Sequence, residues 1–360
     1  MPSQGNCARI DSSAFQHNIA HVKKRIGTEV GIVAMVKANC YGHYVSSLSD
    51  MFSGVDMLGV ATFEEAMALR QAGTETPILL LQGFRNREQL LQCIDQAIIC
   101  VVHDMFQINL LQSLDVSQSL QVWLKVDTGM CRFGFMPDQF VKAYQALVDL
   151  AIVDSNFVIM THLSDAENSD QQHTLGQLQL FRQLTQGLSH PVSIMNSAGL
   201  MSYTDQCCDW VRPGLMLYGV SPYTDRVGAD LGLRPVMSLE SFVYVIKAIK
   251  AGDKVGYGCQ WVCPSDRVIA IVPIGYGDGY PRHVKAGTCV LIRGRRCPII
   301  GAISMDSMMV DISGLPTVAQ GDTVVLWGRD LPVESIAQAA STIPYELLTQ
   351  LGARVARIAM

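Results

Sequence analysis

No apolar run in this 360-residue sequence approaches the roughly 20 residues that a membrane-spanning helix needs. Long runs of basic residues are also missing, and the formal net charge is −5 at pH 7, which argues against nucleic acid as the main partner. The opening residues Met1–Gly5 contain no basic or apolar stretch of the kind that begins a signal peptide. We therefore expect a globular protein that binds neither a membrane nor nucleic acid.

Cysteine pairs with the spacing of a metal site are absent, although cysteine itself is abundant. The eleven cysteines form no Cys-x-x-Cys motif and have no matching pair of histidines, so we expect no metal site. Most of them, such as Cys93, Cys100 and Cys289, stand in apolar surroundings, where a buried free thiol is the usual explanation. Free thiols in this number predict a reducing, cytoplasmic setting.

The first 233 residues contain a regular alternation of strand-like and helix-like segments. Eight apolar runs predict buried strands: Val30–Met35, Met57–Ala61, Ile78–Leu81, Ile98–Val102, Leu120–Val126, Phe157–Thr161, Val192–Met195 and Trp210–Val211. Amphipathic stretches between most of them predict helices: Phe63–Gln71, Arg87–Ile94, Met105–Gln112, Gln139–Leu150 and Gln171–Gly187. This alternation predicts a (β/α)8 barrel, with an open doubly wound sheet as the alternative.

Beyond about Leu233 the pattern changes to short β-rich runs separated by turn signals. The runs predict strands at Phe242–Ile249, Val268–Pro273, Cys289–Ile292, Pro298–Ile303, Met308–Ile312 and Thr323–Trp327. A helix is expected at Val333–Ala340, whereas Ile343–Ile358 gives no clear prediction. We therefore expect a barrel domain at residues 1–233 and a mostly β domain at residues 234–360. Whether residues 1–10, with a short candidate strand at Cys7–Ile10, pack with the second domain is left open.

Lys37 stands at the carboxyl end of the first predicted strand, where a charged side chain needs an explanation. Burying an ammonium group is costly unless it is paired or neutralised. A desolvated lysine of lowered pKa, however, is suited to forming a Schiff base with an aldehyde. Asn39 and Gly42 predict a turn that brings the chain close to a ligand, with the hydroxyl of Tyr41 nearby. The alternative is a lysine with a buried stem and a solvated ammonium group.

Polar residues also follow four other predicted barrel strands. They are Lys125, Asp127 and Arg132 at the fifth strand, His162 at the sixth, Asn196 and Ser197 at the seventh, and Arg212 and Gly214 at the eighth. Each alone has an ordinary explanation, such as an ion pair for Lys125 or Arg212 and a structural hydrogen bond for His162. Because barrel enzymes carry their chemistry on the carboxyl face of the strands, the combination predicts an active site there.

Two segments of the second domain are also unusual. Gly275–Arg282 places three glycines around two tyrosines after a predicted strand, which predicts a tight, exposed turn. The segment lacks the Gly-x-Gly-x-x-Gly spacing of a dinucleotide-binding loop. Ser304–Asp306 follows another β run and could present backbone N–H groups to an anion.

Taken in order, these segments resemble the alanine racemases over nearly the whole chain. The matching segments are Val36–His43, Leu124–Gly134, Thr161–Leu163, Asn196–Ala198, Val211–Gly219, Gly275–Arg282 and Ser304–Asp306. The resemblance implies a fold-type III enzyme that uses pyridoxal 5'-phosphate (PLP) to interconvert L-alanine and D-alanine, supplying D-alanine for cell-wall peptidoglycan. It also implies a homodimer in which each active site borrows residues from the partner's second domain.

By the same resemblance, two residues would carry the proton transfers. Lys37 would bind PLP through its amine and then act as the base on one face of the substrate's α-carbon. Tyr276 of the partner subunit would be the base on the opposite face. Racemisation needs this arrangement, because one group removes a proton and another returns a proton from the far side.

The resemblance assigns the cofactor to several further residues. Arg212 would face the pyridine nitrogen and, because a guanidinium stays protonated, would leave that nitrogen without a proton. The cofactor would then be a weaker electron sink, which we infer limits side reactions. His162 would sit between Arg212 and Tyr276. The phosphate would be held by Tyr41, Ser197 and the backbone at Gly214 and Leu215.

The substrate carboxylate would be bound by Arg132 and by the backbone N–H of Met305 from the partner, with Asp306 in support. Lys125 matches a lysine that is carbamylated in many family members, where it braces the arginine corresponding to Arg132. The chain departs from the pattern at Ala353, where many relatives have a tyrosine that touches the phosphate.

Other functions remain open from the sequence. They are a racemase of another amino acid such as serine or lysine, a decarboxylase of the same fold type, a non-catalytic PLP-binding protein, and a barrel without a cofactor. A decarboxylase would be expected to place an acidic residue, not Arg212, at the pyridine nitrogen. Non-catalytic single-barrel relatives lack the second domain, so Gly275–Arg282 counts against them.

Overall fold

The computed structural model describes residues 5–44, 51–114, 119–204 and 208–360. The chain forms two compact units. Among the described residues, the barrel unit comprises 19–40, 51–114, 119–204 and 208–217, and the β unit comprises 5–18, 41–44 and 218–360.

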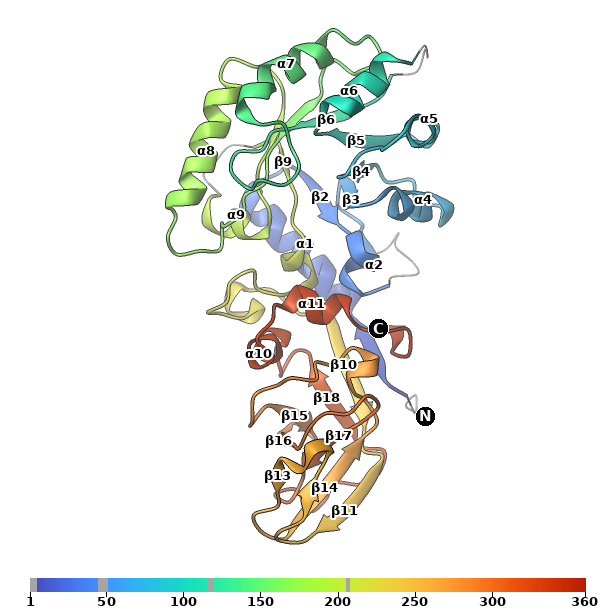
Figure 1. The fold of residues 1–360 in the computed structure, drawn as a ribbon, viewed down its shortest axis with the longest axis vertical. Coiled ribbons are helices and arrows are strands. Elements are labelled where there is room, and N and C mark those ends of the chain that lie inside the picture. Colours follow the sequence, from blue (N-terminus) through green and yellow to red (C-terminus); the bar gives the residue numbers. More distant parts are fainter. Residues whose placement is uncertain (1–4, 45–50, 115–118, 205–207) are drawn as a thin grey trace. The chain divides into compact units, whose positions relative to one another are not determined.

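Eight parallel strands close into a barrel in the barrel unit (Figure 1). They are β2 (Gly31–Met35), β3 (Met57–Val60), β4 (Ile78–Leu80), β5 (Ile98–Val102), β6 (Val122–Lys125), β7 (Val158–Met160), β8 (Val192–Ser193) and β9 (Trp210–Val211). The barrel closes where Gly31 of β2 pairs with Trp210 of β9. Most strand side chains are buried, as expected for parallel strands that are covered on both faces. The predicted (β/α)8 barrel is confirmed, and the open sheet is wrong.

Helices follow the strands and lie on the outside of the barrel (Figure 1). They include α4 (Phe63–Gln71), α5 (Arg87–Asp95), α6 (Met105–Gln112), α7 (Pro137–Val148), α8 (Gln172–Thr185) and α9 (Ser197–Ser202), and α1 (Ser12–Ile26) precedes β2. Side-chain caps set several of their starts; Thr62 and Glu65 form a reciprocal capping box at α4. All five predicted helices are confirmed, with ends that shift by one or two residues at most.

The β unit is built on a nine-stranded sheet with the order β11-β14-β17-β16-β15-β18-β10-β1-β19. Its strands are β1 (Cys7–Ile10), β10 (Met237–Phe242), β11 (Val245–Ile249), β14 (Arg267–Val272), β15 (Cys289–Ile292), β16 (Arg295–Ile300), β17 (Met308–Asp311), β18 (Thr323–Trp327) and β19 (Ala356–Ala359). β1 pairs antiparallel with β10 and parallel with β19. The unit also contains two short strands, β12 (Lys254–Val255) and β13 (Trp261–Val262), and the helices α10 (Val333–Ala339) and α11 (Pro344–Thr349). The mostly β second domain is confirmed.

The prediction of one strand at Phe242–Ile249 is wrong. The segment is divided between β10 and β11 because its backbone changes partners: Val243 donates its N–H to the carbonyl of Asp322, and Tyr244 donates to that of Ile271. β10 therefore pairs with β18, and β11 pairs with β14. A continuous apolar run does not reveal such a change of partner.

Candidate active site

The segment after β2 is a tight left-handed turn, α2 (Lys37–Tyr41). The four residues from Ala38 to Tyr41 have φ values of 51, 52, 56 and 53°. Non-glycine residues in this region cost roughly 1–2 kcal/mol each, and such strain is typically found at functional sites. Two hydrogen bonds hold the turn: Ala38 N–H donates to Oε1 of Glu65 at 2.6 Å, and Cys40 N–H donates to the carbonyl of Val36 at 2.9 Å.

Lys37 has an amine that is easier to deprotonate than that of an ordinary lysine. Burial lowers the pKa of Lys37, the positive charge of Arg132 lowers it further, and the carboxylate of Glu65 acts in the opposite direction. Only a neutral amine can attack a carbonyl or accept a proton. The lowered pKa therefore makes the neutral, nucleophilic form of Lys37 more available.

Lys125, the last residue of β6, is a second perturbed lysine. Its side chain is 8% exposed. Burial and the charges of Arg212 and Arg132 lower the pKa of Lys125 to about 7. Its Nζ lies 5.9 Å from the centre of the Phe133 ring. At neutral pH a large fraction of Lys125 is therefore a neutral amine.

Asp127 organises the loop that carries Arg132. One carboxylate oxygen accepts the N–H groups of Gly129 and Met130, both at 2.8 Å, and the other accepts that of Arg132 at 2.8 Å. Burial acts to raise the pKa of Asp127, but these hydrogen bonds outweigh it and lower the pKa. The carboxylate of Asp127 is thus bound by backbone N–H groups, which fix the loop that carries Arg132. The side chain of Arg132 itself is exposed.

Arg212 is buried among neutral acceptors. Its Nη1 donates to Oγ of Ser193, and its Nη2 donates to the carbonyls of Thr161 at 2.6 Å and Ile194 at 3.3 Å. None of its hydrogen-bond acceptors in the described structure is a carboxylate, so a simple ion pair does not explain it. Burial lowers the pKa of Arg212 to about 10, which still leaves it protonated at neutral pH.

His162, which follows β7, contacts the same arginine. Nη2 of Arg212 lies 3.3 Å from Nδ1 of His162. Burial, followed by the charges of Arg212 and Lys125, holds the pKa of His162 well below its ordinary value. His162 is therefore a neutral imidazole.

The ends of β8 and β9 meet at Ser197. Asn196 caps α9 by accepting the N–H of Gly199 at 2.9 Å, which places Ser197 at the first position of the helix. Oγ of Ser197 accepts N–H groups from Gly214 at 3.0 Å and from Met216 at 3.3 Å. Leu215, between them, begins the short turn η1 (Leu215–Tyr218). The structure thus brings the predicted Ser197, Gly214 and Leu215 together.

The barrel site gathers four basic side chains, and the two guanidinium groups among them stay positively charged. Lys37, Lys125, Arg132 and Arg212 are close enough for their charges to lower the pKa values of neighbouring groups. The carboxylate of Asp127 is occupied by backbone N–H groups. This arrangement, with a nucleophilic amine and a hydroxyl flanked by N–H groups, fits a ligand that carries both an aldehyde and anionic groups.

The β unit brings together Tyr276, Met305 and Asp306. Tyr276 begins the turn η4 (Tyr276–Asp278). Its N–H donates to the carbonyl of Ser304 at 3.1 Å, and the N–H of Gly277 donates to that of Met305 at 2.9 Å. The side chains of Tyr276 and Met305 are 40% and 52% exposed. Both are therefore open to a further molecule.

Tyr41 is buried in the β unit. Its ring stacks on that of Tyr218 with centroids 4.8 Å apart and lies 5.9 Å from that of Tyr345. Burial raises the pKa of Tyr41, so its hydroxyl keeps its proton. Tyr345 is thus an aromatic neighbour from the carboxyl-terminal region, eight positions before Ala353.

The roles of several residues that shape these sites were not predicted from the sequence. The residues are Glu65, which holds the turn after Lys37; Ser193 and Thr161, which accept from Arg212; and Asp278 and Arg354, which contact the Tyr276 and Met305 loops. The capping box at Thr62 and Glu65 was a detectable signal. The others depend on contacts between segments far apart in the chain.

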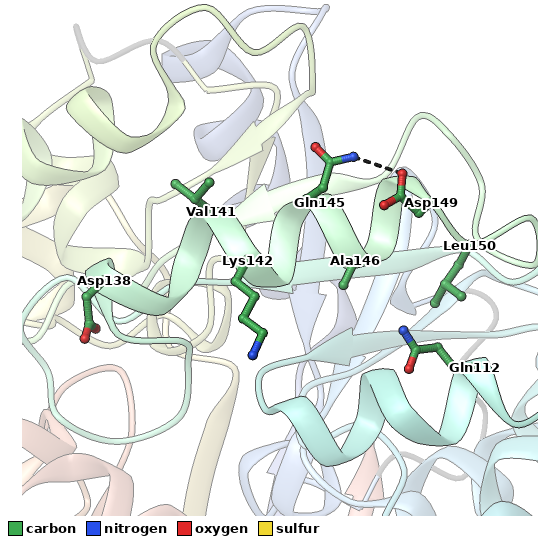
Figure 2. A pocket seen from close by; sticks show the side chains of 8 residues that line it. All are labelled: Gln112, Asp138, Val141, Lys142, Gln145, Ala146, Asp149 and Leu150. Carbon is green, nitrogen blue, oxygen red and sulfur yellow. Dashed lines mark hydrogen bonds between the residues drawn. The ribbon is translucent and has the colours of Figure 1, made fainter.

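Two surface hollows lie away from these residues. One, of about 750 Å³, lies along α7 beside Gln112 of α6 (Figure 2), and its charged residues are Asp138, Lys142 and Asp149. The other, of about 1040 Å³, lies in the β unit and includes Arg267, Arg282, Lys285 and Asp311. Neither contains Lys37 or Tyr276. In the described part of the chain, no cluster of His, Cys, Asp and Glu could hold a metal ion. Nor does any helix among the described residues have the length and apolar character to span a membrane.

The chain thus combines two features. One is a parallel (β/α)8 barrel with Lys37 among basic side chains, and the other is a mostly β unit. Residues 10–222 match the family model of the alanine racemase N-terminal domain, and residues 236–359 match that of the C-terminal domain. The chain belongs to the alanine racemase family.

Relatives and solved structures agree with this placement. An alanine racemase of Coxiella burnetii is 41% identical over 353 residues, covering 97% of each chain. One of Nitrosococcus oceani is 43% identical and covers 97% of this chain and 98% of its own. The structure of an alanine racemase from Acinetobacter baumannii matches with a TM-score of 0.94 and 34% identity, over 99% of this chain and 100% of the other. A biosynthetic alanine racemase from Pseudomonas aeruginosa matches with a TM-score of 0.93 and 35% identity, over 99% of each chain.

Proposed function

We propose that the protein is a PLP-dependent racemase that interconverts L-alanine and D-alanine and supplies D-alanine for peptidoglycan in the cytoplasm. The family supports the reaction, since the relatives that match 97% of the chain are named alanine racemase. The observation that carries the proposal in this chain is Lys37, an amine of lowered pKa at the end of a barrel strand within a cluster of cations.

The residues that the resemblance assigns to the cofactor fit PLP. Lys37 would bind its aldehyde, and Arg212, supported by His162, would face its ring nitrogen. The phosphate would be bound by Tyr41, Ser197 and the backbone N–H groups at Gly214 and Leu215. The positive charge of the guanidinium groups suits this anionic group, and the protonated hydroxyl of Tyr41 is a suitable donor.

The two proposed proton carriers are Lys37 and Tyr276. PLP, when bound, withdraws electrons from the carbon that bears the substrate's amino group and so makes its hydrogen acidic. Nζ of Lys37 would remove or return that proton on one face, and the hydroxyl of Tyr276 would do so on the other. The lowered pKa of Lys37 makes its neutral, proton-accepting form available.

Substrate binding is proposed for Arg132 and Met305. The guanidinium of Arg132 would bind the substrate carboxylate, and the loop fixed by Asp127 would orient it. The backbone N–H of Met305 would add a second contact, with Asp306 in support. Lys125 would brace Arg132 once its neutral amine has added carbon dioxide to form an anionic carbamate.

The active form is proposed to be a homodimer with shared sites. Tyr276 and Met305 are half-exposed on one part of the β unit, so they are available to a second copy of the chain. In this proposal they complete the site formed by Lys37 and Arg212 of the partner. The division into a PLP-binding domain at residues 1–233 and a second domain at 234–360 stays part of the proposal, and it falls between the two family-model matches.

The test is to incubate the purified protein with PLP and each of L-alanine, L-serine and L-lysine while following optical rotation. Loss of rotation with L-alanine at the highest kcat/KM is expected. A higher kcat/KM with serine or lysine would change the substrate. Release of carbon dioxide, or PLP binding without any change in rotation, would overturn the racemase assignment.

A further inference from the structure

Arg354 lies where two proposed active-site loops of the β unit meet. One loop carries Tyr276, and the other carries Met305. Nε of Arg354 lies 3.1 Å from Oδ1 of Asp278, two residues after the tyrosine. Nη1 of the same guanidinium donates to Oδ1 of Asp306, next to the methionine, at 2.8 Å. One side chain therefore bridges the two loops.

The contact between Arg354 and Asp278 matters because it compensates the charge of a nearly buried carboxylate. The side chain of Asp278 is only 5% exposed, whereas that of Arg354 is 51% exposed. The other oxygen of Asp278 accepts the N–H of Gly275 at 2.9 Å, so the carboxylate also closes the turn that presents Tyr276. A buried carboxylate that loses its cation is left uncompensated, and the turn built on it would rearrange.

The segment around Arg354 also packs directly on the turn. The N–H of Gly352 donates to the carbonyl of Asp278 at 3.0 Å. A Cβ placed on Gly277 would collide with the guanidinium of Arg354, and one on Gly279 would collide with the backbone at Gln350 and Leu351. The position of the tyrosine is therefore set from the carboxyl-terminal segment as well as from its own loop.

We infer that Arg354 is a positioning residue that fixes the loops of Tyr276 and Met305 relative to each other. The inference rests on the proposed function, in which Tyr276 moves the proton on one face and Met305 contacts the substrate carboxylate. A forked guanidinium can bind two separate carboxylates at once, whereas a lysine ammonium acts as a point charge. Small displacements of a positioned group from its reacting geometry can cost about 100-fold in rate.

The experiment compares Arg354→Ala and Arg354→Lys with the matched control Arg293→Ala. Arg293 also pairs with a carboxylate of the β unit, through two contacts of 2.8 and 3.0 Å to Asp322, but it touches neither loop. Exchange of the α-hydrogen with D2O is measured at saturating L-alanine and at saturating D-alanine, together with KM. PLP absorbance and reduction onto Lys37 by borohydride report the cofactor separately from turnover.

Arg354→Ala is expected to lower exchange from L-alanine about 10- to 100-fold and to raise KM, with less than about a threefold loss of exchange from saturating D-alanine. Arg354→Lys is expected to recover part of the loss, and Arg293→Ala to behave as wild type. PLP absorbance should be unchanged in all three. If Arg354→Ala does not fold, Arg354→Lys and Asp306→Asn must show the same one-sided loss in smaller measure.

The inference would be overturned if Arg354→Ala lost α-hydrogen exchange equally from both enantiomers, lost PLP, or kept full activity. In these cases the wild type would still racemise alanine, so the proposed function would stand. A wild-type protein that binds PLP but does not racemise alanine would overturn the proposed function and this inference with it.

Discussion

Nη2 of Arg212 lies 3.3 Å from Nδ1 of His162, and this contact determines which nitrogen of the neutral imidazole carries the proton. A guanidinium can only donate a hydrogen bond, so Nδ1 of His162 must accept. The proton of the neutral ring is therefore on Nε2. Burial and the charge of Arg212 both keep the ring from taking a second proton.

His162 is therefore expected to remain neutral at and below the ordinary histidine pKa of 6.5. In the unfolded chain it gains a proton near that pH, whereas in the folded protein it does not, so its contribution to stability is lost as the pH falls below 6.5. Urea unfolding of His162→Asn should show a shallower loss of stability with acid than wild type does. The exposed His173→Asn is the control, and an imidazole NMR signal of His162 that titrates at its ordinary pKa would contradict the account.

Lys37→Ala should remove the covalent attachment of PLP. We expect loss of the visible absorbance and of borohydride labelling, and a fall in racemase activity of about 10²- to 10⁴-fold, because both the attachment and one proton carrier are lost. Lys142→Ala, on the outer helix α7 (Figure 2), should retain all three properties. An unchanged visible spectrum in Lys37→Ala would show that PLP binds elsewhere.

Lys125 should accept carbon dioxide. Its pKa of about 7 leaves most of the side chain as a neutral amine at about pH 8, and such an amine can attack carbon dioxide and release a proton to form a carbamate. Native mass spectrometry in bicarbonate should show the added mass of one carbon dioxide, which is lost after unfolding in acid. Lys125→Met should lack the adduct. A wild-type mass without the adduct would leave Lys125 as a free amine and remove its proposed part in bracing Arg132.

Gly42→Ala should destabilise the protein more than its backbone angle alone explains. Gly42 has φ of +77°, and a Cβ there would overlap the carbonyl of Leu348. Gly252 has a similar φ of +89° with nothing within 4 Å, so it isolates the cost of the angle. We expect a loss of about 3 kcal/mol or more for Gly42→Ala and about 1 kcal/mol for Gly252→Ala in urea unfolding. Equal losses would mean that the contact relaxes without cost.

Local sequence patterns predicted most of the fold. Buried parallel strands have nearly continuous apolar runs and amphipathic helices have a period of 3.6, so both can be recognised within a few residues. The break between Phe242 and Val245 could not be recognised, because it arises from a change of hydrogen-bonding partner across the sheet. The same holds for β19, whose partner β1 lies at the other end of the chain.

The site was predictable where one residue type carries the chemistry, as at Lys37 and Arg212. Its supporting structure was not. The left-handed turn from Ala38 to Tyr41 uses residues that do not normally favour positive φ, so only the surrounding contacts specify it. The bridge from Arg354 to Asp278 and Asp306 joins positions that are 76 and 48 residues apart in sequence, and ion pairs at such separations leave no local pattern.

The central claim is that each site combines Lys37 of one subunit with Tyr276 of the other. The most direct measurement mixes two inactive variants, Lys37→Ala and Tyr276→Phe, after dissociation and reassociation of the subunits. In a shared-site dimer, one site of each mixed dimer contains both substitutions and the other contains neither. Since about half of the dimers in an equal mixture are mixed, about a quarter of wild-type activity should return. Continued inactivity in the presence of proven mixed dimers would place Lys37 and Tyr276 in the same subunit's site and contradict the account.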